Sequence, residues 1–145
     1  MKPRMLLKEV NPAALAMVGL EKDGASLDKK LKELVKIRTS QLNRCAFCLH
    51  IHATDARKLG ETEVRIYMLN AWRETTYFTP QERAALALTE AVTLVASNHV
   101  PDDVYEEVAR HFSEQEISEL LMAIITINSW NRIIITTGLT PPVAI

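Results

Sequence analysis

The sequence predicts an all-α fold, on three observations. Glycine and proline are scarce, at 4 and 6 of 145 residues, and they lie between periodic segments rather than inside them. Apolar residues recur at the three- and four-residue spacing of amphipathic helices. No segment shows the sustained apolar–polar alternation that is typical of a strand, although residues 133–137 have strand propensity. We therefore expect a single helical domain over residues 1–145.

The first two helices are predicted from their starting residues. Asn11-Pro12 combines an N-cap with a proline in the first turn, and it should open a short helix that ends near Leu20. Ser26 is expected to cap the second helix. The apolar face of that helix repeats at helical spacing over Leu27, Leu31, Leu34, Val35 and Leu42. This second helix should break at Asn43 or Arg44.

The middle of the chain predicts three further helices. One should cover residues 45–59, with Gly60 as its C-terminal stop. The next should span residues 61–72. Thr79-Pro80-Gln81-Glu82 has the spacing of a capping box, which predicts a helix from this point to Ala96.

The last two helices also have recognisable starts. Pro101 should open a short helix that ends near Phe112, and Ser113-Glu114-Gln115-Glu116 is a second capping box. The helix that follows contains the run Leu120–Ile127, which is apolar nearly all the way round. Such a helix is normally covered on more than one side, and we therefore expect a homo-oligomer.

Composition limits the classes of partner and the compartment. Hydrophobic residues make up 48% and charged residues 24%, and the net charge is −1 with the basic residues scattered, so neither nucleic acid nor a membrane surface is expected as a partner. The uncharged run 10–20 contains Asn11 and Pro12 and is too short to span a bilayer. A single close pair of cysteines is typical of redox or metal chemistry in a reducing compartment, which predicts a cytoplasmic protein.

The segment 45–52 holds both cysteines and two of the four histidines. In a helix, at about 100° per residue, Cys48 lies roughly 60° and His52 about 20° from Cys45 around the axis, whereas His50 points roughly the opposite way. Two thiols and an imidazole on one face indicate a dithiol redox site. Such a pair can reduce a hydroperoxide through a sulfenic acid and then a disulfide.

Local geometry leaves the identity of the attacking thiol open. Only a thiolate is a good nucleophile, so the site must promote loss of the thiol proton. Cys45 is expected in the first turn of its helix, where the helix dipole stabilises negative charge. Cys48 lies four residues before His52, which could act as its base.

Two other interpretations of these residues compete with the redox site. Zinc would require the four ligands Cys45, Cys48, His50 and His52, but a regular helix directs His50 away from the others. The cysteines could instead pack in a helical core without any chemistry. His99 and His111 have no motif around them and are expected at the surface or at helix caps.

Glu33 completes a longer pattern. It precedes Cys45 by twelve positions (45 − 33 = 12), so that Glu33, Cys45, Cys48 and His52 read E-x11-C-x2-C-x3-H. This pattern, with the segments 34–43, 53–57 and 82–88, resembles the AhpD-like alkylhydroperoxidase branch of the carboxymuconolactone decarboxylase family. The resemblance covers residues 10–135.

The resemblance implies an all-α, AhpD-like helical domain that assembles as a homotrimer or homohexamer. It implies an antioxidant peroxidase that reduces organic hydroperoxides. Glu33 and His52, with a water, would deprotonate Cys48, and Cys45 would be the resolving partner near the surface. It implies neither a bound cofactor nor a metal. An external dithiol, of lipoyl type, would restore the thiols, with a lipoyl-bearing or peroxiredoxin-type protein as redox partner.

One departure from the family pattern motivates an alternative. Some members carry a histidine between the cysteines, whereas this chain has Ala46-Phe47, and Phe47 cannot relay a proton. The alternative is a thiol-disulfide oxidoreductase or redox-sensing protein with little peroxidase activity. A third hypothesis is a non-redox oligomeric binding or lyase domain with incidental thiols. The decarboxylase branch lacks the cysteine pair, which argues against lactone decarboxylation.

Two further groups have open interpretations. A polar cluster near the C-terminus either lines the thiol pocket or a subunit contact, or caps a helix end with its tryptophan in the core: Asn128, Trp130, Asn131 and Arg132. Three aromatics either cover a substrate entrance or pack in the core or an interface: Trp72, Tyr77 and Phe78. His50 is expected at the surface or an interface.

Overall fold

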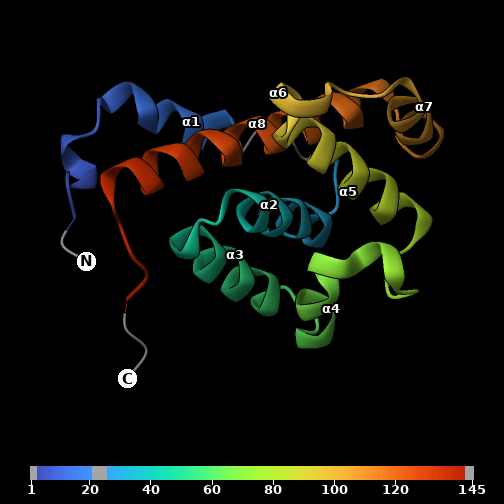
Figure 1. Cartoon of the computed structure of the whole chain (residues 1–145), viewed down its shortest axis with the longest axis horizontal. Coiled ribbons are helices and arrows are strands. Elements are labelled where there is room, and N and C mark those ends of the chain that lie inside the picture. The colour runs from blue at the N-terminus through green and yellow to red at the C-terminus, as the bar shows by residue number, and fades with distance from the viewer. Residues whose placement is uncertain (1–2, 21–25, 143–145) are drawn as a thin grey trace.

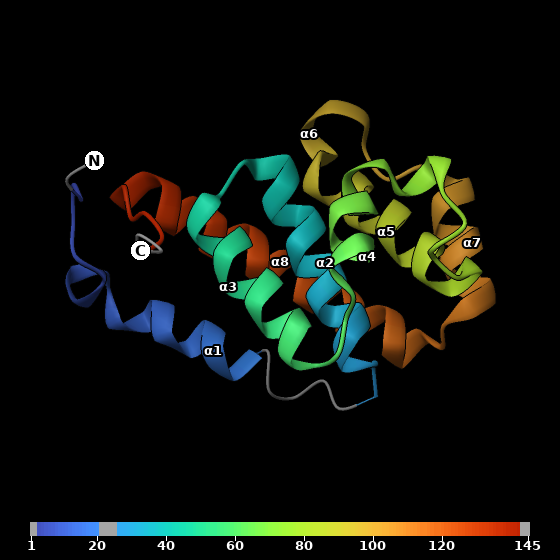
Figure 2. The same ribbon diagram turned by 90° about the horizontal axis from the view of Figure 1, so that it is seen from below.

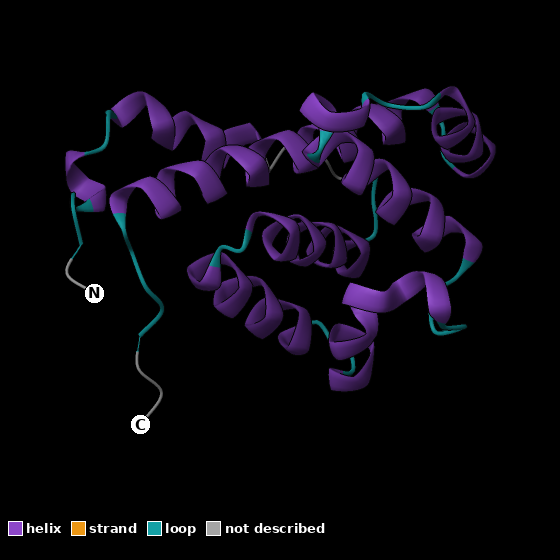
Figure 3. Ribbon diagram, viewed as in Figure 1, coloured by secondary structure: helices purple, strands orange, loops and turns teal. Residues whose placement is uncertain are grey.

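The computed structural model describes residues 3–20 and 26–142, and within these ranges it contains helices and no strands (Figure 3). The predicted all-α fold is therefore confirmed. The elements in chain order are the 3-10 helices η1 (Leu7–Glu9) and η2 (Pro12–Leu15), then α1 (Ala16–Leu20), α2 (Lys29–Asn43), α3 (Ala46–Lys58), α4 (Glu63–Met68), η3 (Leu69–Glu74), α5 (Pro80–Thr93), α6 (Val95–Asn98), α7 (Asp102–His111) and α8 (Glu114–Thr137).

Helix α2 lies at the centre of the fold. It packs against α3, α5 and α8. Figure 1 shows it between α8 and α3, and Figure 2 shows α2 and α3 side by side in front of α8. Its apolar residues Leu31, Leu34, Val35 and Ile37 are almost completely buried. Because α2 is covered on several sides, its side chains reach both the main core and the segment that holds the cysteines.

Side-chain caps define where several helices begin. Thr79 Oγ1 accepts a hydrogen bond from the Glu82 amide, and the Glu82 carboxylate accepts one from the Thr79 amide, at 3.2 and 2.8 Å. Ser113 and Glu116 form the same reciprocal pair at 3.3 and 2.8 Å. These two capping boxes satisfy amides that the first helical turn leaves unpaired, and both predictions are confirmed.

Ser26 does not cap the second helix, so that prediction was wrong. Asp28 is the N-cap, because its Oδ1 accepts a hydrogen bond from the Leu31 amide at 3.0 Å. The Ser26 hydroxyl instead donates to Glu119 of α8 at 2.6 Å. This contact joins the start of α2 to α8.

The predicted helix over residues 61–72 is divided into α4 and η3. Ala71 leaves helical geometry, with φ −121° and ψ 32°. The break allows the buried Trp72 to donate its indole N–H to Glu90 at 2.8 Å, while Arg83 donates to the Trp72 carbonyl, also at 2.8 Å. The next helix, α5, also ends earlier than predicted, because Leu94 departs from helical geometry before α6 begins.

Helix α8 runs across the whole molecule (Figure 1). Residues 133–137 belong to it, so their strand propensity is overridden by the helix around them. By length and composition α8 could cross a membrane, but half of its most apolar window is buried in the fold, which is typical of a core helix. Leu121, Ile125 and Ile135 remain exposed on its outer face. Subunit association across such a face stays a prediction.

Candidate active site

The turn between α2 and α3 presents the first cysteine. Arg44 adopts the left-handed conformation with φ 58°, which ends α2. The Cys45 amide donates to the Ser40 carbonyl at 3.0 Å, and the Cys45 carbonyl accepts from the Leu49 amide at 3.0 Å. The predicted break at Asn43 or Arg44 is confirmed, and Cys45 is the N-cap of α3 rather than a residue of its first turn.

Cys45 and Cys48 form a disulfide, with their Cα atoms 5.4 Å apart. They are only 1% and 4% exposed. Apolar side chains from α3, from the second half of α8 and from the segment after it cover them: Phe47, Ile127, Trp130, Ile134 and Leu139. The expectation that Cys45 lies near the surface was therefore wrong, because these side chains pack over the turn.

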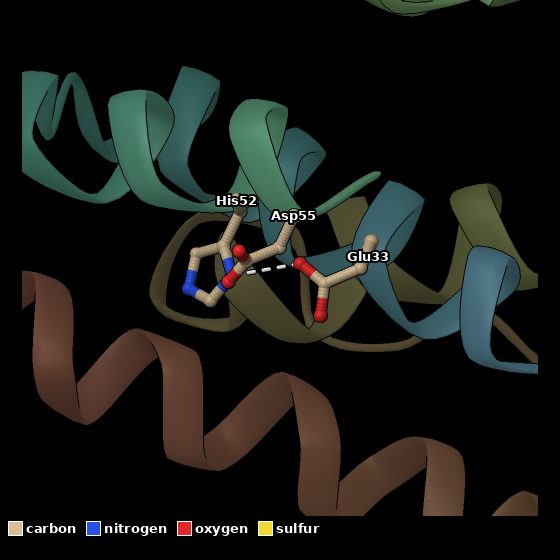
Figure 4. Close-up of side chains that lie close together, drawn as sticks. All are labelled: Glu33, His52 and Asp55. Atoms are coloured by element: carbon tan, nitrogen blue, oxygen red, sulfur yellow. Dashed lines mark hydrogen bonds and ion pairs between the residues drawn. The ribbon is translucent and has the colours of Figure 1, made fainter. Parts of the chain in front are cut away.

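Glu33 and His52 are in direct contact across the packed helices α2 and α3. Glu33 Oε2 lies 2.8 Å from His52 Nδ1, and Lys36 Nζ donates to the other carboxylate oxygen, Oε1, at 3.1 Å. Figure 4 shows the carboxylate and the imidazole converging from the two helices. Glu33 is only 8% exposed, so the interpretation of this residue as an ordinary solvated glutamate is excluded.

The contacts of Glu33 keep its carboxyl group ionised. Burial opposes ionisation and is the largest single influence on the pKa of Glu33. The hydrogen bond to His52 and the charge of Lys36 together outweigh burial, so the pKa lies below its ordinary value of 4.5. An ionised carboxylate accepts a hydrogen bond from Nδ1–H of His52, which leaves Nε2 as the basic nitrogen of the ring.

The four residues of the predicted pattern all lie on the α2–turn–α3 unit. The structure brings Glu33 to His52 and Cys45 to Cys48, and His52 follows Cys48 by one turn of α3. The unit can therefore store two electrons in its sulfur pair and hold a proton on an imidazole one turn away. The roles assigned to each residue in a reaction stay predictions.

Asp55 is a neighbour of this site that the sequence analysis missed. Its carboxylate, the His52 ring and the Glu33 carboxylate each offer one ligand atom within 4.8 Å of the others (Figure 4). The signal was available, because Asp55 follows His52 by three residues and so shares its face of α3. The zinc set that includes His50 is not assembled, because His50 is exposed and the two sulfurs are bonded to each other.

Comparisons with known proteins identify the family of this chain. The profile of the carboxymuconolactone decarboxylase family matches residues 10–91, more than half of the chain. A solved structure from Agrobacterium tumefaciens, described as a candidate antioxidant defence protein AhpD, superposes with a TM-score of 0.93 at 35% identity, over 99% of this chain and 100% of that one. This chain is an AhpD-like member of the family.

Other relatives agree on the fold. The uncharacterised protein YdfG of Bacillus subtilis is 45% identical over 141 residues, which cover 95% of this chain and 96% of YdfG. The debrominase Bmp8 superposes with a TM-score of 0.79 at 20% identity, over 88% of this chain and 70% of Bmp8. At that identity, the similarity to Bmp8 concerns the fold alone.

In this AhpD-like chain, a buried asparagine network lies behind the cysteine turn. Asn43 Nδ2 donates to Asn128 Oδ1 and to Asn131 Oδ1, both at 2.9 Å, and Asn131 Nδ2 donates to Ser40 Oγ at 3.1 Å. The interpretation of this cluster as the cap of a helix end was wrong, because α8 continues to Thr137. The network instead connects α8 to the turn that carries Cys45.

The aromatic residues divide between core and surface. Trp72 and Phe78 are buried in the core beside α2, whereas Tyr77 is 49% exposed. Trp130, which packs against the cysteines, also forms one wall of an apolar hollow of about 270 Å³. The other walls come from the N-terminal segment: Leu7, Lys8, Val10, Asn11, Pro12, Ala14 and Leu15. This hollow, rather than the Trp72 region, adjoins the candidate site.

Proposed function

We propose that this AhpD-like protein is an antioxidant alkyl hydroperoxide reductase that uses Cys45 and Cys48 as a redox dithiol. The observation that carries the proposal is the buried contact between Glu33 and His52, one helical turn from Cys48. A cysteine pair that only filled the core would not require an ionised carboxylate oriented on an imidazole beside it. The Agrobacterium relative, described as a candidate antioxidant protein, supports the same class of activity.

The proposed reaction begins from the reduced protein. The Cys48 thiolate attacks the terminal oxygen of the hydroperoxide, so that an S–O bond forms, the O–O bond breaks and the alcohol leaves with a proton. Cys48 is then a sulfenic acid. The Cys45 thiol attacks that sulfur and loses its proton, which forms the disulfide and releases water. An external dithiol reduces the disulfide and is itself oxidised.

The Glu33–His52 pair supplies the proton handling in this scheme. His52 would accept the Cys48 proton at Nε2, while the ionised Glu33 stabilises the imidazolium through Nδ1–H. The same imidazolium could return a proton to the departing alkoxide. This assignment favours Cys48 as the attacking thiol. Cys48 lies four residues, about one helical turn, before His52, whereas Cys45 lies at the start of α3, seven residues before His52.

An organic hydroperoxide is favoured over hydrogen peroxide as the substrate. The hollow beside Trp130 is lined mainly by apolar side chains, and Trp130 also packs against the cluster that contains the two cysteines. Apolar walls favour an alkyl or aryl group on the substrate. An external dithiol of lipoyl type, carried by a lipoyl-bearing or peroxiredoxin-type partner, is proposed as the reductant, in a cytoplasmic setting.

A second candidate function is thiol-disulfide exchange with a partner protein and little peroxidase activity. Phe47 favours it, because this residue between the cysteines cannot move protons and packs in the cluster that covers them. The two functions use the same sulfur atoms and differ in the oxidant. Peroxide chemistry passes through a sulfenic acid on one cysteine, whereas exchange passes through a mixed disulfide.

Stopped-flow oxidation of the reduced protein distinguishes them. We expect cumene hydroperoxide to convert the dithiol to the disulfide rapidly, and Cys45→Ser to trap a sulfenic acid on Cys48 that mass spectrometry detects. Cys48→Ser should react no faster than a free thiol. Rapid oxidation by a disulfide-bearing protein, with peroxide rates at the level of free cysteine, would reject the peroxidase and support the exchange function.

A further inference from the structure

Glu33, His52 and Asp55 form a compact group of metal-ligand atoms, and the peroxidase scheme gives Asp55 no role. One atom from each residue lies within 4.8 Å of the other two, and the group joins two helices, α2 and α3. Glu33 is buried, and His52 and Asp55 are partly buried. The group differs from a surface cluster of acidic side chains because it contains an imidazole and is held by helix packing.

The donor set indicates the class of ion. One imidazole nitrogen and two carboxylate oxygens suit a divalent transition ion such as Zn²⁺, whereas Mg²⁺ prefers oxygen ligands alone. The 2.8 Å separation of His52 Nδ1 and Glu33 Oε2 is now bridged by a proton. An ion bound by both atoms would replace that proton and require only a small separation of the two.

The local charges also permit a cation. The group itself contains two carboxylates, and Lys36 pairs with the outer oxygen of Glu33 rather than with the one next to His52. Asp55 contacts Lys58 at 2.9 Å, but that ion pair is exposed. An exposed ion pair is worth little, so a metal could draw Asp55 away from Lys58 at small cost.

We propose that Glu33, His52 and Asp55 form a binding site for a divalent transition-metal ion, with Zn²⁺ as the reference ion. The site shares Glu33 and His52 with the proton relay, so bound metal and proton transfer exclude each other. Metal binding itself does not depend on the peroxidase function. The inhibition of peroxide turnover by bound metal, in contrast, rests on the proposed peroxidase function.

Titration of the oxidised protein with zinc chloride tests the site directly. The disulfide removes both thiolates as competing ligands, so calorimetry reports zinc binding by the other side chains of the chain. We expect one ion per chain, and no comparable binding of magnesium chloride. Mutation of a residue that only hydrogen-bonds to a metal ligand typically lowers metal affinity by about 10–100-fold. Asp55→Asn removes a carboxylate that would bind the ion directly, so it should weaken zinc binding by about 100-fold.

Asp102→Asn, an exposed position at the start of α7, is the matched control and should leave zinc affinity unchanged. Absence of saturable binding at millimolar zinc would overturn the proposal. So would equal affinity in the wild type and in Asp55→Asn, which would assign the ion to surface histidines. Either result leaves the peroxidase proposal untouched.

Peroxide turnover supplies the second readout. Zinc should inhibit the wild type, and Asp55→Asn should require about 100-fold more zinc for half-inhibition, in line with the lost affinity, when each rate is expressed relative to the zinc-free rate of the same protein. Equal inhibition of both proteins would mean that zinc acts on the reduced thiols, and it would refute the coupling to the relay. If the protein has no peroxidase activity, the calorimetric result still decides whether the metal site exists.

Discussion

The carboxylate oxygen Oε2 of Glu33 lies 2.8 Å from Nδ1 of His52, in an interface between α2 and α3 that leaves Glu33 only 8% exposed. The pair fixes the tautomer of the imidazole, since Nδ1 donates its hydrogen to the carboxylate and Nε2 becomes the acceptor. A fixed acceptor one turn from Cys48 is what a thiol peroxidase needs for deprotonation on demand.

Glu33→Gln should slow peroxide reduction. The amide keeps the size of the side chain but cannot stabilise an imidazolium, so we expect the second-order rate constant with cumene hydroperoxide to fall by about 10²-fold at neutral pH, within the usual range for acid–base assistance. Stopped-flow measurement checks it. Glu63→Gln, an exposed glutamate of α4, is the control and should keep the wild-type rate. An undiminished rate in Glu33→Gln would remove Glu33 from the relay.

The same substitution should change how stability depends on pH. Because the folded pKa of Glu33 is lowered, its contacts stabilise the fold fully above the ordinary value of 4.5, and this stabilisation is lost as the pH falls through the lower folded value. Glu33→Gln should cost about 1–3 kcal/mol at neutral pH, with the difference from the wild type narrowing below pH 4.5. Urea denaturation at a series of pH values measures this difference. A gap that stays constant down to acidic pH would contradict the assignment.

Asn131→Ala should destabilise the turn that carries Cys45. Asn131 is completely buried and links Asn43 to Ser40, so its loss removes one of the two hydrogen bonds that Asn43 donates and the one that the buried Ser40 hydroxyl accepts. We expect a loss of about 2–4 kcal/mol in the free energy of unfolding. Ser129→Ala on the same helix, whose hydroxyl bonds only the Ile125 carbonyl, should stay within about 0.5 kcal/mol of the wild type. Equal effects of the two variants would show that the asparagine network has no special importance.

Trp130→Ala should alter substrate preference. The indole walls the apolar hollow and packs against the cysteine pair, so its removal takes apolar contact from a bulky substrate. We expect the rate ratio of cumene hydroperoxide to hydrogen peroxide to fall about tenfold, equivalent to about 1.4 kcal/mol of lost contact. Tyr105→Ala, at an exposed position on α7, is the aromatic control and should leave the ratio unchanged. If the rate constants for the two substrates fall by the same factor, the hollow does not select between them.

Leu121→Glu combined with Ile125→Glu should weaken self-association. Both side chains are exposed, at 37% and 44%, and they lie one turn apart on the outer face of α8. Charged residues buried in a subunit interface would be strongly unfavourable. We expect light scattering to detect a trimer or hexamer for the wild type and smaller species for the double variant. Val95→Glu, exposed on α6, is the control. A wild-type monomer would refute the oligomer prediction.

Much of the local structure could be predicted because its causes lie within a few residues of each other. The capping boxes at Thr79 and Ser113 satisfy amides three positions away, and the break at Arg44 separates two periodic segments. The break at Ala71 could not be predicted, because it depends on the contact between Trp72 and Glu90, eighteen positions apart. The spacing of apolar residues alone predicts an uninterrupted helix at such a position.

By itself the sequence determined the helical class, the three-residue separation that lets Cys45 and Cys48 pair, and the presence of His52 one turn further along the same helix. These follow from spacing, because a helix converts positions three or four apart into neighbours. Spacing also puts Asp55 on the face of α3 that holds His52, but only the tertiary structure decided that both residues meet Glu33, nineteen positions before His52, and that Cys45 is buried. Those relations depend on how α2, α3 and α8 pack, and no local spacing encodes the angle and register at which separate helices meet.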